Sequence, residues 1–260
     1  MPLVSVIVTT FNRKDKLKET LDSILCQSFQ DFELIVVDNF SDYDFVAFIN
    51  SFENEKLIPI QNNNHGTIAV NRNVGIKNAK GEFIAFCDDD DIWVPHKLAT
   101  QLDALQNANA DFVSSNAFIF DKEIHQITGK SKNRLVRNIN DFLKSNQIST
   151  STVLVRKSKM LFFDETRTLE SIEDYALWLE LYIARYKFSF IEENLIFYRY
   201  GSSNISINNW ILGHYRKIFL FSQMAIKHPN LKIEFTLHLV IIQNLIIIMA
   251  KKILQFFKLK

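Results

Sequence analysis

The chain has 260 residues, of which 47% are hydrophobic and 23% are charged, and it contains only 6 Gly and 4 Pro. This composition excludes disordered and collagen-like proteins, and the length predicts one large domain or one domain with a helical appendage. The 30 basic and 29 acidic side chains give a formal net charge of +1, so no overall electrostatic field favours nucleic acid as a partner.

The amino-terminal residues and the cysteines predict a cytoplasmic protein. Residues 1–8 lack the basic flank, the long apolar region and the cleavage site of a signal peptide. Cys26 and Cys87 each lie in an apolar stretch, which predicts buried thiols in a reducing compartment rather than a disulfide framework or a multi-cysteine zinc site.

Apolar runs alternate with amphipathic segments in the first half of the chain. The apolar runs predict strands over residues 3–8, 34–37, 57–60 and 83–87. Helical spacing of apolar residues predicts helices over 17–25, 42–52 and 67–78. It predicts a fourth helix with Pro95 in its first turn and Leu98, Leu102 and Leu105 on one face. Gly81 stands where a glycine commonly stops a helix. Together these elements predict an α/β fold with a mostly parallel sheet covered on both faces.

The pattern changes after residue 111. Further strands are predicted over 112–113, 118–120 and 152–155, and residues 130–138 form a basic polar loop. A helix is predicted over 173–186, and two short strands follow over 188–191 and 195–200.

Polar residues stand at the ends of three predicted strands. Thr9 and Thr10 follow the first strand, Asp38 follows the second, and four aspartates occupy residues 88–91 after the fourth. Ligands of open parallel sheets bind at the carboxyl ends of the strands, so these residues predict one cleft. The chain has neither of the glycine-rich phosphate-binding motifs, G-x-G-x-x-G and G-x-x-x-x-G-K-[ST]. Any phosphate must therefore be neutralised by other groups.

The four aspartates predict a divalent cation site. Adjacent carboxylates at the end of an apolar strand repel one another when they are partly desolvated. Mg²⁺ or Mn²⁺ binds hard oxygen ligands and typically uses one or two carboxylates together with substrate phosphates. The alternative is a solvated acidic turn in which one aspartate caps the next helix.

Four segments together resemble the inverting glycosyltransferases of family 2, which have the glycosyltransferase A fold. Residues 4–13 are similar to the opening strand and base-contacting loop of that family, and residues 34–38 to its second strand and nucleoside-binding aspartate. Asn71-Arg72-Asn73-Val74-Gly75 resembles its A-R-N-x-G helix, and residues 86–93 resemble its D-x-D-D segment. Each segment is weak evidence alone, but their order and spacing are specific over about the first two hundred residues.

The resemblance implies a nucleotide-diphosphate sugar, most often a UDP-sugar, across the strand ends. Thr9 and Phe11 would line the base pocket, with Phe11 where the family often has tyrosine. Asp38 would accept hydrogen bonds from the uracil or the ribose, and Arg72 would reach the base or the diphosphate. The alternatives are that Asp38 only forms a turn and that Arg72 is a solvated side chain on a helix.

The resemblance also assigns roles within the acidic turn. Asp88 and Asp90 would form the outer positions of the D-x-D motif, with Asp90 as the direct ligand of a Mn²⁺ or Mg²⁺ ion that bridges the two phosphates. Asp89 and Asp91 would then be auxiliary, with Asp89 on the nucleotide side.

Residues 171–178 are similar to the E-D segment that supplies the catalytic base in this family. An inverting transfer is one in-line displacement at the anomeric carbon, so a carboxylate must remove the proton from the acceptor hydroxyl. The resemblance implies Asp174 as this base, with Glu173 in support. The alternative is structural, because Ser171 and Asp174 have the spacing of a capping box.

Several other residues have no assigned role. Trp93 and Trp178 are interpreted as core side chains, although either could stack on an acceptor sugar. Residues 198–206 resemble a loop that closes over the diphosphate, but Gly201 stands where a histidine is common, so that contact is expected to be missing. His65 is interpreted as a surface residue.

The carboxyl-terminal segment predicts an interfacial helix. From residue 237 the chain is mostly apolar, but Lys251 and Lys252 occur before the roughly 20 apolar residues that a spanning helix needs. A helical projection places one set of polar residues opposite one set of apolar residues: Asn244, Lys251, Gln255 and Lys258 against Ile242, Leu245, Ile246, Met249, Ile253 and Phe256. This pattern predicts contact with a membrane surface. The alternative is packing on the catalytic domain or on a dimer partner.

The complete interpretation is a metal-dependent inverting glycosyltransferase at the inner face of the cell membrane. It would move a hexose (glucose, galactose or an N-acetyl derivative) from a UDP-sugar to a glycan or lipid-diphosphate-linked acceptor during synthesis of O-antigen, capsule or lipooligosaccharide. Residues 1–206 would form the catalytic domain, with a donor half over 1–110 and an acceptor half over 111–206. Residues 207–260 would form helices at the membrane surface.

Two other functions are compatible with an α/β sheet of this kind. A sugar-phosphate nucleotidyltransferase would need a glycine-rich loop after the first strand, and residues 9–15 contain no glycine. A non-catalytic membrane-associated module would bind nucleotide without turnover.

Overall fold

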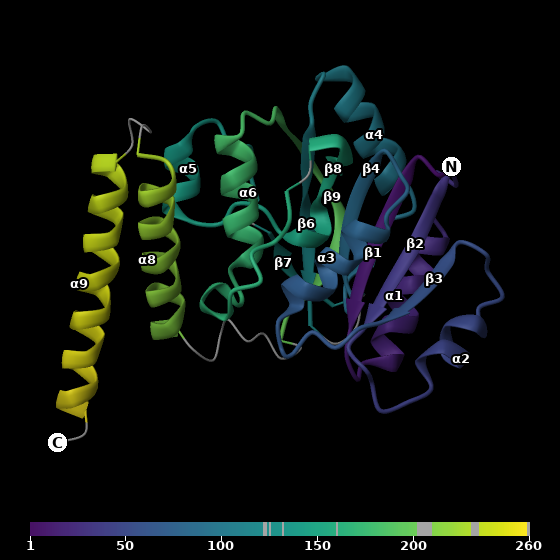
Figure 1. The fold of residues 1–260 in the computed structure, drawn as a ribbon, viewed down its shortest axis with the longest axis horizontal. Helices are drawn as coiled ribbons and strands as arrows, with labels where there is room; N and C mark the ends of the chain where they lie inside the picture. Colours follow the sequence, from purple (N-terminus) through teal and green to yellow (C-terminus); the bar gives the residue numbers. More distant parts are fainter. Residues whose placement is uncertain are drawn as a thin grey trace.

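The computed structural model describes residues 1–121, 124, 126–131, 133–159, 161–201, 210–229 and 234–258. One mixed sheet crosses the molecule, and helices cover both of its faces (Figure 1). The strands are β1 (Val4–Thr10), β2 (Phe32–Asp38), β3 (Leu57–Gln61), β4 (Phe83–Asp88), β5 (Ile92–Trp93), β6 (Phe112–Phe120), β7 (Ile127–Lys130), β8 (Leu154–Arg156) and β9 (Phe188–Arg199). The helices are α1 (Lys14–Leu25), α2 (Phe45–Asn50), α3 (Ile68–Asn78), α4 (Lys97–Asn107), α5 (Ile139–Lys144), α6 (Glu173–Ile183), α8 (Trp210–Lys227) and α9 (Glu234–Lys258), with short 3-10 turns η1 (Thr150–Thr152), η2 (Lys157–Lys159) and η3 (Arg167–Leu169).

The first half of the chain forms the predicted parallel sheet. The strand order is β3-β2-β1-β4-β8-β6-β9-β5, and β7 pairs with β6. Strands β3, β2, β1 and β4 are parallel, and their register aligns Thr10 with Asp38 and Thr9 with Asp88. The polar residues predicted to share a cleft therefore lie at one edge of the sheet.

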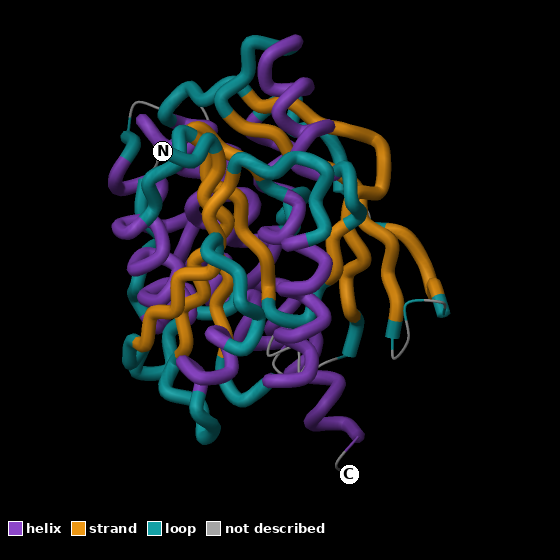
Figure 2. Tube along the Cα trace, turned by 90° about the vertical axis from the view of Figure 1, so that its right-hand side faces the viewer, coloured by secondary structure: helices purple, strands orange, loops and turns teal. Residues whose placement is uncertain are grey.

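Helices on both faces bury the sheet, as the continuous apolar strands predict. Every residue of β1 and β2 is buried. Alternate side chains of each strand face opposite layers. One layer contains apolar residues of α1, α2 and α4, and the other contains residues of α3, α5, α6 and α8. In the view turned by 90°, helices lie on both sides of the central strands, and further strands form the right-hand edge of the molecule (Figure 2). Two full layers fix the strand ends, and with them the geometry of the cleft.

The second half of the chain differs from the prediction in several elements. The runs expected over 112–113 and 118–120 belong to one strand, β6, and residue 152 lies in η1 rather than in a strand. Strand β7 and helix α5 were not predicted.

The two short strands expected over 188–191 and 195–200 are one strand, β9, which pairs in parallel with β6 along its length. The exposed Glu192 and Glu193 interrupt the apolar pattern at a point where the register with β6 shifts around Asn116. An irregularity in a strand moves side chains out of strict alternation, so the sequence looks like two strands with a gap.

Two smaller predictions are wrong. Gly81 does not stop α3, which ends at Asn78 with an extended Ala79. A Cβ atom on Gly81 would lie 2.6 Å from the backbone nitrogen of Ser5, so the glycine permits close approach to β1. Cys26 is exposed at the end of α1, whereas Cys87 is buried as predicted.

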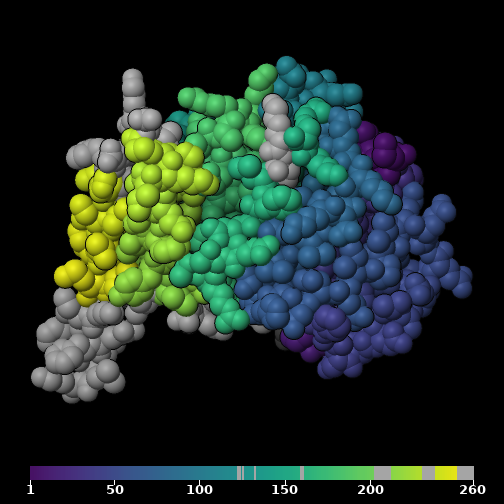
Figure 3. Space-filling view, in the orientation of Figure 1, coloured from purple at the N-terminus to yellow at the C-terminus, as the bar shows by residue number. Residues whose placement is uncertain are grey.

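The carboxyl-terminal helices α8 and α9 pack against each other at the end of the molecule opposite β1 and β2 (Figures 1 and 3). No helix among the described residues is long and apolar enough to cross a membrane. The polar Asn244 of α9 is buried against His214 of α8, and the apolar side of α9 faces outward. The exposed apolar side chains are Leu239, Ile242, Leu245, Ile246 and Met249. We call these five residues the outer stripe of α9.

Candidate active site

A cavity of about 560 Å³ opens at the carboxyl ends of β1 and β2. Its lining includes four of the predicted site residues: Thr9, Phe11, Asp89 and Glu173. The other lining residues are Thr10, Asn12, Arg13, Asn39, Asn64, Gly66, Ile68, Asn71, Glu170 and Ser171. The volume is within the range of small-ligand sites, and most of the lining groups are polar.

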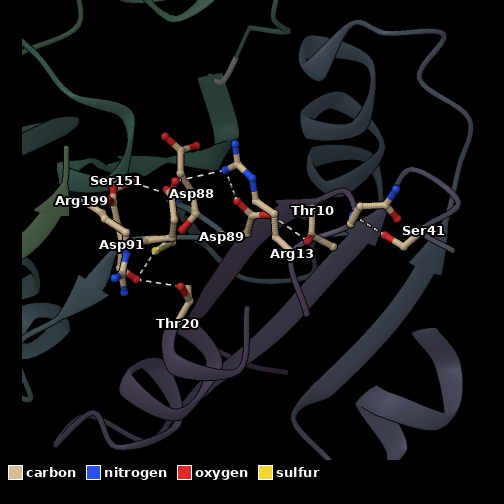
Figure 4. A network of polar contacts seen from close by, with 12 residues as sticks. Thr10, Arg13, Thr20, Ser41, Asp88, Asp89, Asp91, Ser151 and Arg199 are labelled. Atoms are coloured by element: carbon tan, nitrogen blue, oxygen red, sulfur yellow. Dashed lines mark hydrogen bonds and ion pairs between the residues drawn. The ribbon is translucent and has the colours of Figure 1, made fainter. Parts of the chain in front are cut away.

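The acidic turn lies beside this cavity and is held by arginines (Figure 4). Arg13 Nη1 lies 2.9 Å from Asp89 Oδ1 and 3.1 Å from Asp90 Oδ2. Asp89 Oδ2 also accepts a hydrogen bond of 2.7 Å from the hydroxyl of Thr10. These contacts supply much of the positive charge that four adjacent aspartates require.

Burial raises the pKa of two carboxyl groups in the acidic turn, those of Asp89 and Asp91. Burial raises the pKa of Asp89 to about 6, although the guanidinium of Arg13 opposes the shift. Burial and the carboxylates of Asp88 and Asp90 raise the pKa of Asp91 well above its usual range. Asp91 Oδ1 accepts a hydrogen bond of 3.0 Å from the backbone of Arg199 on β9, so Asp91 ties the turn to the sheet.

Arg72 is buried on α3 and joins the two acidic segments. Its Nη2 lies 2.9 Å from Asp88 Oδ1, and its Nη1 lies 2.7 Å from Glu173 Oε1. Burial lowers the pKa of the Arg72 guanidinium, but the carboxylates of Asp88 and Glu173 outweigh this effect, so the pKa of Arg72 is raised. The alternative of a solvated arginine on a helix face is therefore wrong.

Asp38 is fully buried at the end of β2 and does not line the cavity. Its Oδ1 accepts a hydrogen bond of 2.5 Å from the Ser41 hydroxyl, and its Oδ2 accepts bonds from the Ser41 backbone at 3.0 Å and from Gln61 at 3.2 Å. Asp38 thus orders the loop after β2, as the turn-forming alternative expects. A nucleoside contact from Asp38 stays a prediction.

Glu173 and Asp174 begin α6 and point to different partners. Glu173 faces Arg72, and its second oxygen, Oε2, is buried without a hydrogen-bond partner among the described residues. Asp174 Oδ2 accepts bonds from Asn146 at 3.1 Å and from Thr150 at 3.2 Å. Burial and the charge of Glu173 raise the pKa of Asp174 to about 7, against the opposing charge of Arg72. A carboxyl group that titrates near neutral pH suits a general base.

The capping-box alternative for residues 171–174 is wrong. The N-cap residue of α6 is Ile172, and it makes no side-chain capping bond. Asp174 Oδ1 accepts its backbone bond from the adjacent Tyr175. Ser171 has φ of 68°, a left-handed conformation that is strained for serine and that turns the chain into the helix.

Sequence reasoning missed the η1 turn, which connects the acidic turn to the E-D segment. Ser151 Oγ accepts a bond of 3.0 Å from the backbone nitrogen of Asp88, and the neighbouring Thr150 donates to Asp174. Arg13 ends the segment over residues 4–13 that resembles the opening strand and loop of the family, but that resemblance implies no role for it. Small hydroxyl residues and one arginine are common in loops, and only the fold brings them to these carboxylates.

The residues of the turn fit a metal ion that is shared with a substrate. Among the described residues, no three Asp, Glu, His or Cys side chains are grouped so that they could hold an ion by themselves. Asp88 and Asp90 are hard-oxygen donors two residues apart in the turn, and the side chain of Asp88 is 33% exposed. Mg²⁺ and Mn²⁺ commonly bind through one or two carboxylates completed by phosphate oxygens.

The remaining predictions concern residues outside this cluster. Trp93 and Trp178 are both buried core residues, as interpreted. His65 lies in an exposed turn with φ of 50°, and its carbonyl oxygen accepts a bond from Arg167. Of the loop predicted over 198–206 to close over the diphosphate, the structure describes residues 198–201, and the rest lies outside the described residues.

Comparison with known proteins identifies relatives along most of the chain. The model of the family described as glycosyl transferase family 2 matches residues 5–168. The chain is 32% identical over 217 residues to UDP-Glc:alpha-D-GlcNAc-diphosphoundecaprenol beta-1,3-glucosyltransferase WfaP of Escherichia coli, covering 81% of this chain and 82% of the relative. It is 28% identical over 218 residues to the putative teichuronic acid biosynthesis glycosyltransferase TuaG of Bacillus subtilis, covering 80% and 83%.

Solved structures share the fold at low sequence identity. S. aureus TarS 1-349 in complex with UDP matches with a TM-score of 0.71 and 20% identity, over 94% of this chain and 71% of that chain. The mannosyltransferase PcManGT from Pyrobaculum calidifontis, in complex with GDP-Man and Mn²⁺, matches with a TM-score of 0.64 and 19% identity, over 96% and 73%.

Proposed function

We propose that this chain, which belongs to glycosyl transferase family 2, transfers a hexose from a UDP-sugar to a hydroxyl of an acceptor, with inversion. It has the glycosyltransferase A fold and is a glycosyltransferase. The proposed acceptor is a glycan or a lipid-diphosphate-linked sugar. The observation that carries this proposal is the path of ion pairs from Asp88 through Arg72 to Glu173. It joins a diphosphate-binding turn to a helix start that presents a carboxylate base.

The donor would lie along the cavity with its nucleoside toward β1 and β2. Phe11 is half exposed and would stack on the base, while Thr9 borders it. The diphosphate would lie toward the acidic turn, where Arg13 and Arg72 supply positive charge. The UDP complex of TarS and the UDP-Glc in the name of WfaP support a uridine donor.

Asp88 and Asp90 would hold a Mn²⁺ or Mg²⁺ ion, which when bound supplies positive charge to the departing diphosphate. The Mn²⁺ in the PcManGT complex supports a divalent ion in this fold. Arg13 contacts Asp90 and Arg72 contacts Asp88. These two guanidinium groups would adjust around the ion and keep the turn ordered.

Asp174 would act as the catalytic base. The acceptor oxygen forms a bond to the anomeric carbon as the bond from that carbon to the β-phosphate oxygen breaks, and the carboxylate of Asp174 takes the hydroxyl proton. The raised pKa of Asp174, about 7, matches this task near neutral pH. Glu173 would hold the base segment in place through Arg72.

The acceptor and the location follow from the relatives and from α9. The name of WfaP specifies a diphosphoundecaprenol-linked sugar, and that of TuaG specifies teichuronic acid synthesis. These names support an acceptor for bacterial surface polysaccharide, and the proposal places the reaction at the cytoplasmic face of the membrane. The outer stripe of α9 would contact the lipid surface, with residues 1–206 forming the catalytic domain and 207–260 the membrane-facing helices.

A UDP-release assay tests the proposal. Wild type would be given UDP-Glc, UDP-Gal or UDP-GlcNAc with a GlcNAc-diphospholipid acceptor, with and without Mn²⁺. We expect metal-dependent release with at least one donor, and a loss of about 10² or more in rate for Asp90→Ala and Asp174→Asn. Asp103→Asn, on the exposed side of α4, is the matched control and should retain the wild-type rate. Nucleotide binding without release from any donor would contradict a transferase, and full activity of Asp174→Asn would remove the base assignment.

A further inference from the structure

One amide in the cavity lacks a hydrogen-bond partner. Asn71 lies on α3, lines the cavity and is 1% exposed. Its Oδ1 accepts a bond of 2.8 Å from Asn62 Nδ2, but its Nδ2 is buried with no partner among the described residues. Native proteins rarely leave a buried donor unsatisfied, because its desolvation is not repaid. A donor of this kind in the wall of a ligand cavity indicates that the ligand supplies the missing hydrogen-bond acceptor.

The neighbouring side chain fixes which end of the amide faces the cavity. Asn62 Nδ2 donates to Asn71 Oδ1 and also lies 3.4 Å from the carbonyl oxygen of Asn63. The carbonyl oxygen of Asn63 can only accept, so the amide end of Asn62 that faces it and Asn71 must be the nitrogen. The oxygen of Asn71 is therefore held by Asn62, and the NH₂ group of Asn71 is left as the free end.

The position of Asn71 separates it from the charged part of the site. Asn62 also donates its backbone N–H to the carbonyl oxygen of Asp38 at 2.9 Å, so Asn71 is tied to the end of β2. Arg72, the next residue, points instead to Asp88 and Glu173. The two residues thus face the two ends of the cleft, with Arg72 toward the diphosphate and Asn71 toward the nucleoside.

We propose that Asn71 determines nucleotide specificity by donating a hydrogen bond from Nδ2 to an oxygen of the donor nucleoside, either a base carbonyl or a ribose hydroxyl. This inference rests on the proposed UDP-sugar donor. The A-R-N-x-G pattern that this segment resembles has alanine at this position, which has no donor to offer. Asn71 therefore adds a polar contact that the pattern lacks.

The test compares nucleotide affinities by calorimetry for the full-length wild type and Asn71→Ala. We expect Asn71→Ala to bind UDP about tenfold more weakly, the size of effect of one lost hydrogen bond to a buried oxygen. Affinity for inorganic pyrophosphate should not change. Asn78→Ala removes an exposed amide from the same helix and should bind UDP as wild type does.

Two further ligands distinguish the base from the ribose. CDP replaces the O4 carbonyl of uracil with an amino group, and 2′-deoxy-UDP lacks one ribose hydroxyl. If wild type binds CDP more weakly than UDP and Asn71→Ala does not, the oxygen is O4 of the base. If the same pattern holds for 2′-deoxy-UDP, the oxygen is the 2′-hydroxyl of the ribose. If Asn71→Ala binds UDP like wild type, or loses pyrophosphate affinity equally, the inference is overturned.

A stability measurement excludes a merely structural role for Asn71. Asn71→Ala also removes the oxygen that accepts from Asn62, so its Tm is compared in an Asn62→Ala background, where that bond is already lost. In that background Asn71→Ala removes an amide that has no partner among the described residues, and it should leave the Tm unchanged while it still weakens UDP binding about tenfold. Unchanged UDP affinity in that background would contradict the proposal. If wild type prefers another nucleoside diphosphate to UDP, the proposed donor fails, and the same comparison with that nucleotide decides the role of Asn71. If wild type binds no nucleoside diphosphate, both proposals fail.

Discussion

Arg72 is the residue on which the charge network depends. It is buried and forms ion pairs with both Asp88 and Glu173. We expect Arg72→Met to lower the free energy of unfolding by about 3–5 kcal/mol, because breaking a buried ion pair leaves uncompensated charge in the interior. Urea denaturation at neutral pH measures this effect.

Arg13 provides the control for this prediction. Its side chain is 31% exposed, so water can solvate the carboxylates of Asp89 and Asp90 when it is removed. Arg13→Met should therefore cost about 1 kcal/mol or less. If both variants lose the same free energy of unfolding, the ion pairs of Arg72 contribute no more to stability than those of Arg13.

Asp174 predicts the pH dependence of the reaction. As a base it must be ionised, and its pKa is raised to about 7. We expect kcat/KM to rise tenfold per pH unit below about 7 and to level off above it. A rate that is constant between pH 5 and 8 would exclude Asp174 as the titrating group.

The same shift predicts how stability depends on pH. An unfolded aspartate has a pKa of roughly 3.9, so the folded state holds more protons at Asp174 between about pH 4 and 7. The contribution of Asp174 to stability therefore falls as the pH rises through this window. Asp174→Asn cannot ionise, and its free energy of unfolding relative to wild type should increase from pH 4 to pH 7. Denaturation curves at both pH values check this sign.

At the residue scale, the sequence predicted which residues lie near the site better than it predicted the contacts between their side chains. The order of Thr9, Thr10, Asp38 and residues 88–91 predicted one cleft, and the register of β1, β2 and β4 aligns these groups at one sheet edge, although Asp38 does not line the cavity. It could not predict that Arg13 would pair with Asp89 and Asp90, or that Thr150 would reach Asp174. Those contacts depend on the tertiary packing of loops, which has no local signal.

At the element scale, Gly81 illustrates how a correct residue can have the wrong explanation. Its position after α3 is typical of a helix stop, but in the structure it allows the segment before β4 to approach the backbone of Ser5 and Val4. The separation between backbone segments is a tertiary property. Sequence spacing therefore could not distinguish the two roles.

We expect Gly81→Ala to destabilise the protein by about 1–3 kcal/mol, because the added methyl meets backbone atoms at 2.6 and 2.7 Å that cannot rotate away. Gly213→Ala is the matched control. Gly213 lies inside α8 with no atom within 4 Å of an added Cβ, so this change should stabilise by about 0.5–1 kcal/mol. Thermal unfolding of both variants tests the prediction, and a neutral Gly81→Ala would contradict the close-approach role.

At the scale of the whole molecule, the position of α9 relates the cleft to a surface. The polar Asn244 is buried against α8, and the outer stripe is exposed, so the helix packs on the domain and still presents apolar side chains. The two alternatives from the sequence, packing and surface contact, are thus compatible. Although α9 lies at the opposite end of the molecule from β1 and β2, its last turn and the carboxyl ends of β1, β2 and β4 all point to the bottom of the view (Figure 1).

Vesicle co-sedimentation tests the outer stripe. We expect Ile246→Glu to weaken binding to phosphatidylglycerol-containing vesicles by about tenfold or more, because it removes the burial of one large apolar side chain in lipid. Gln243→Glu adds the same charge to the same helix at an exposed polar position. If both variants lose binding equally, charge rather than apolar contact explains the effect. If wild type does not sediment with vesicles, membrane contact by α9 is wrong.

The overall architecture was predictable because the family motifs occur in a fixed order along the strands. Alternating apolar strands and helices predicted the parallel half of the sheet, and the structure confirms it from β3 to β4. The mixed half was less predictable. Strand β9 crosses to pair with β6 in parallel and with β5 in the antiparallel direction, and such long-range pairing leaves no periodic signal.

The most direct test is a crystal structure of the protein with UDP and Mn²⁺. We predict that the uridine lies over Phe11 near the end of β2, and that the ion lies between the diphosphate and the carboxylates of Asp88 and Asp90. UDP bound at another surface, or an ion that contacts neither aspartate, would contradict the assignment of this cleft as the donor site.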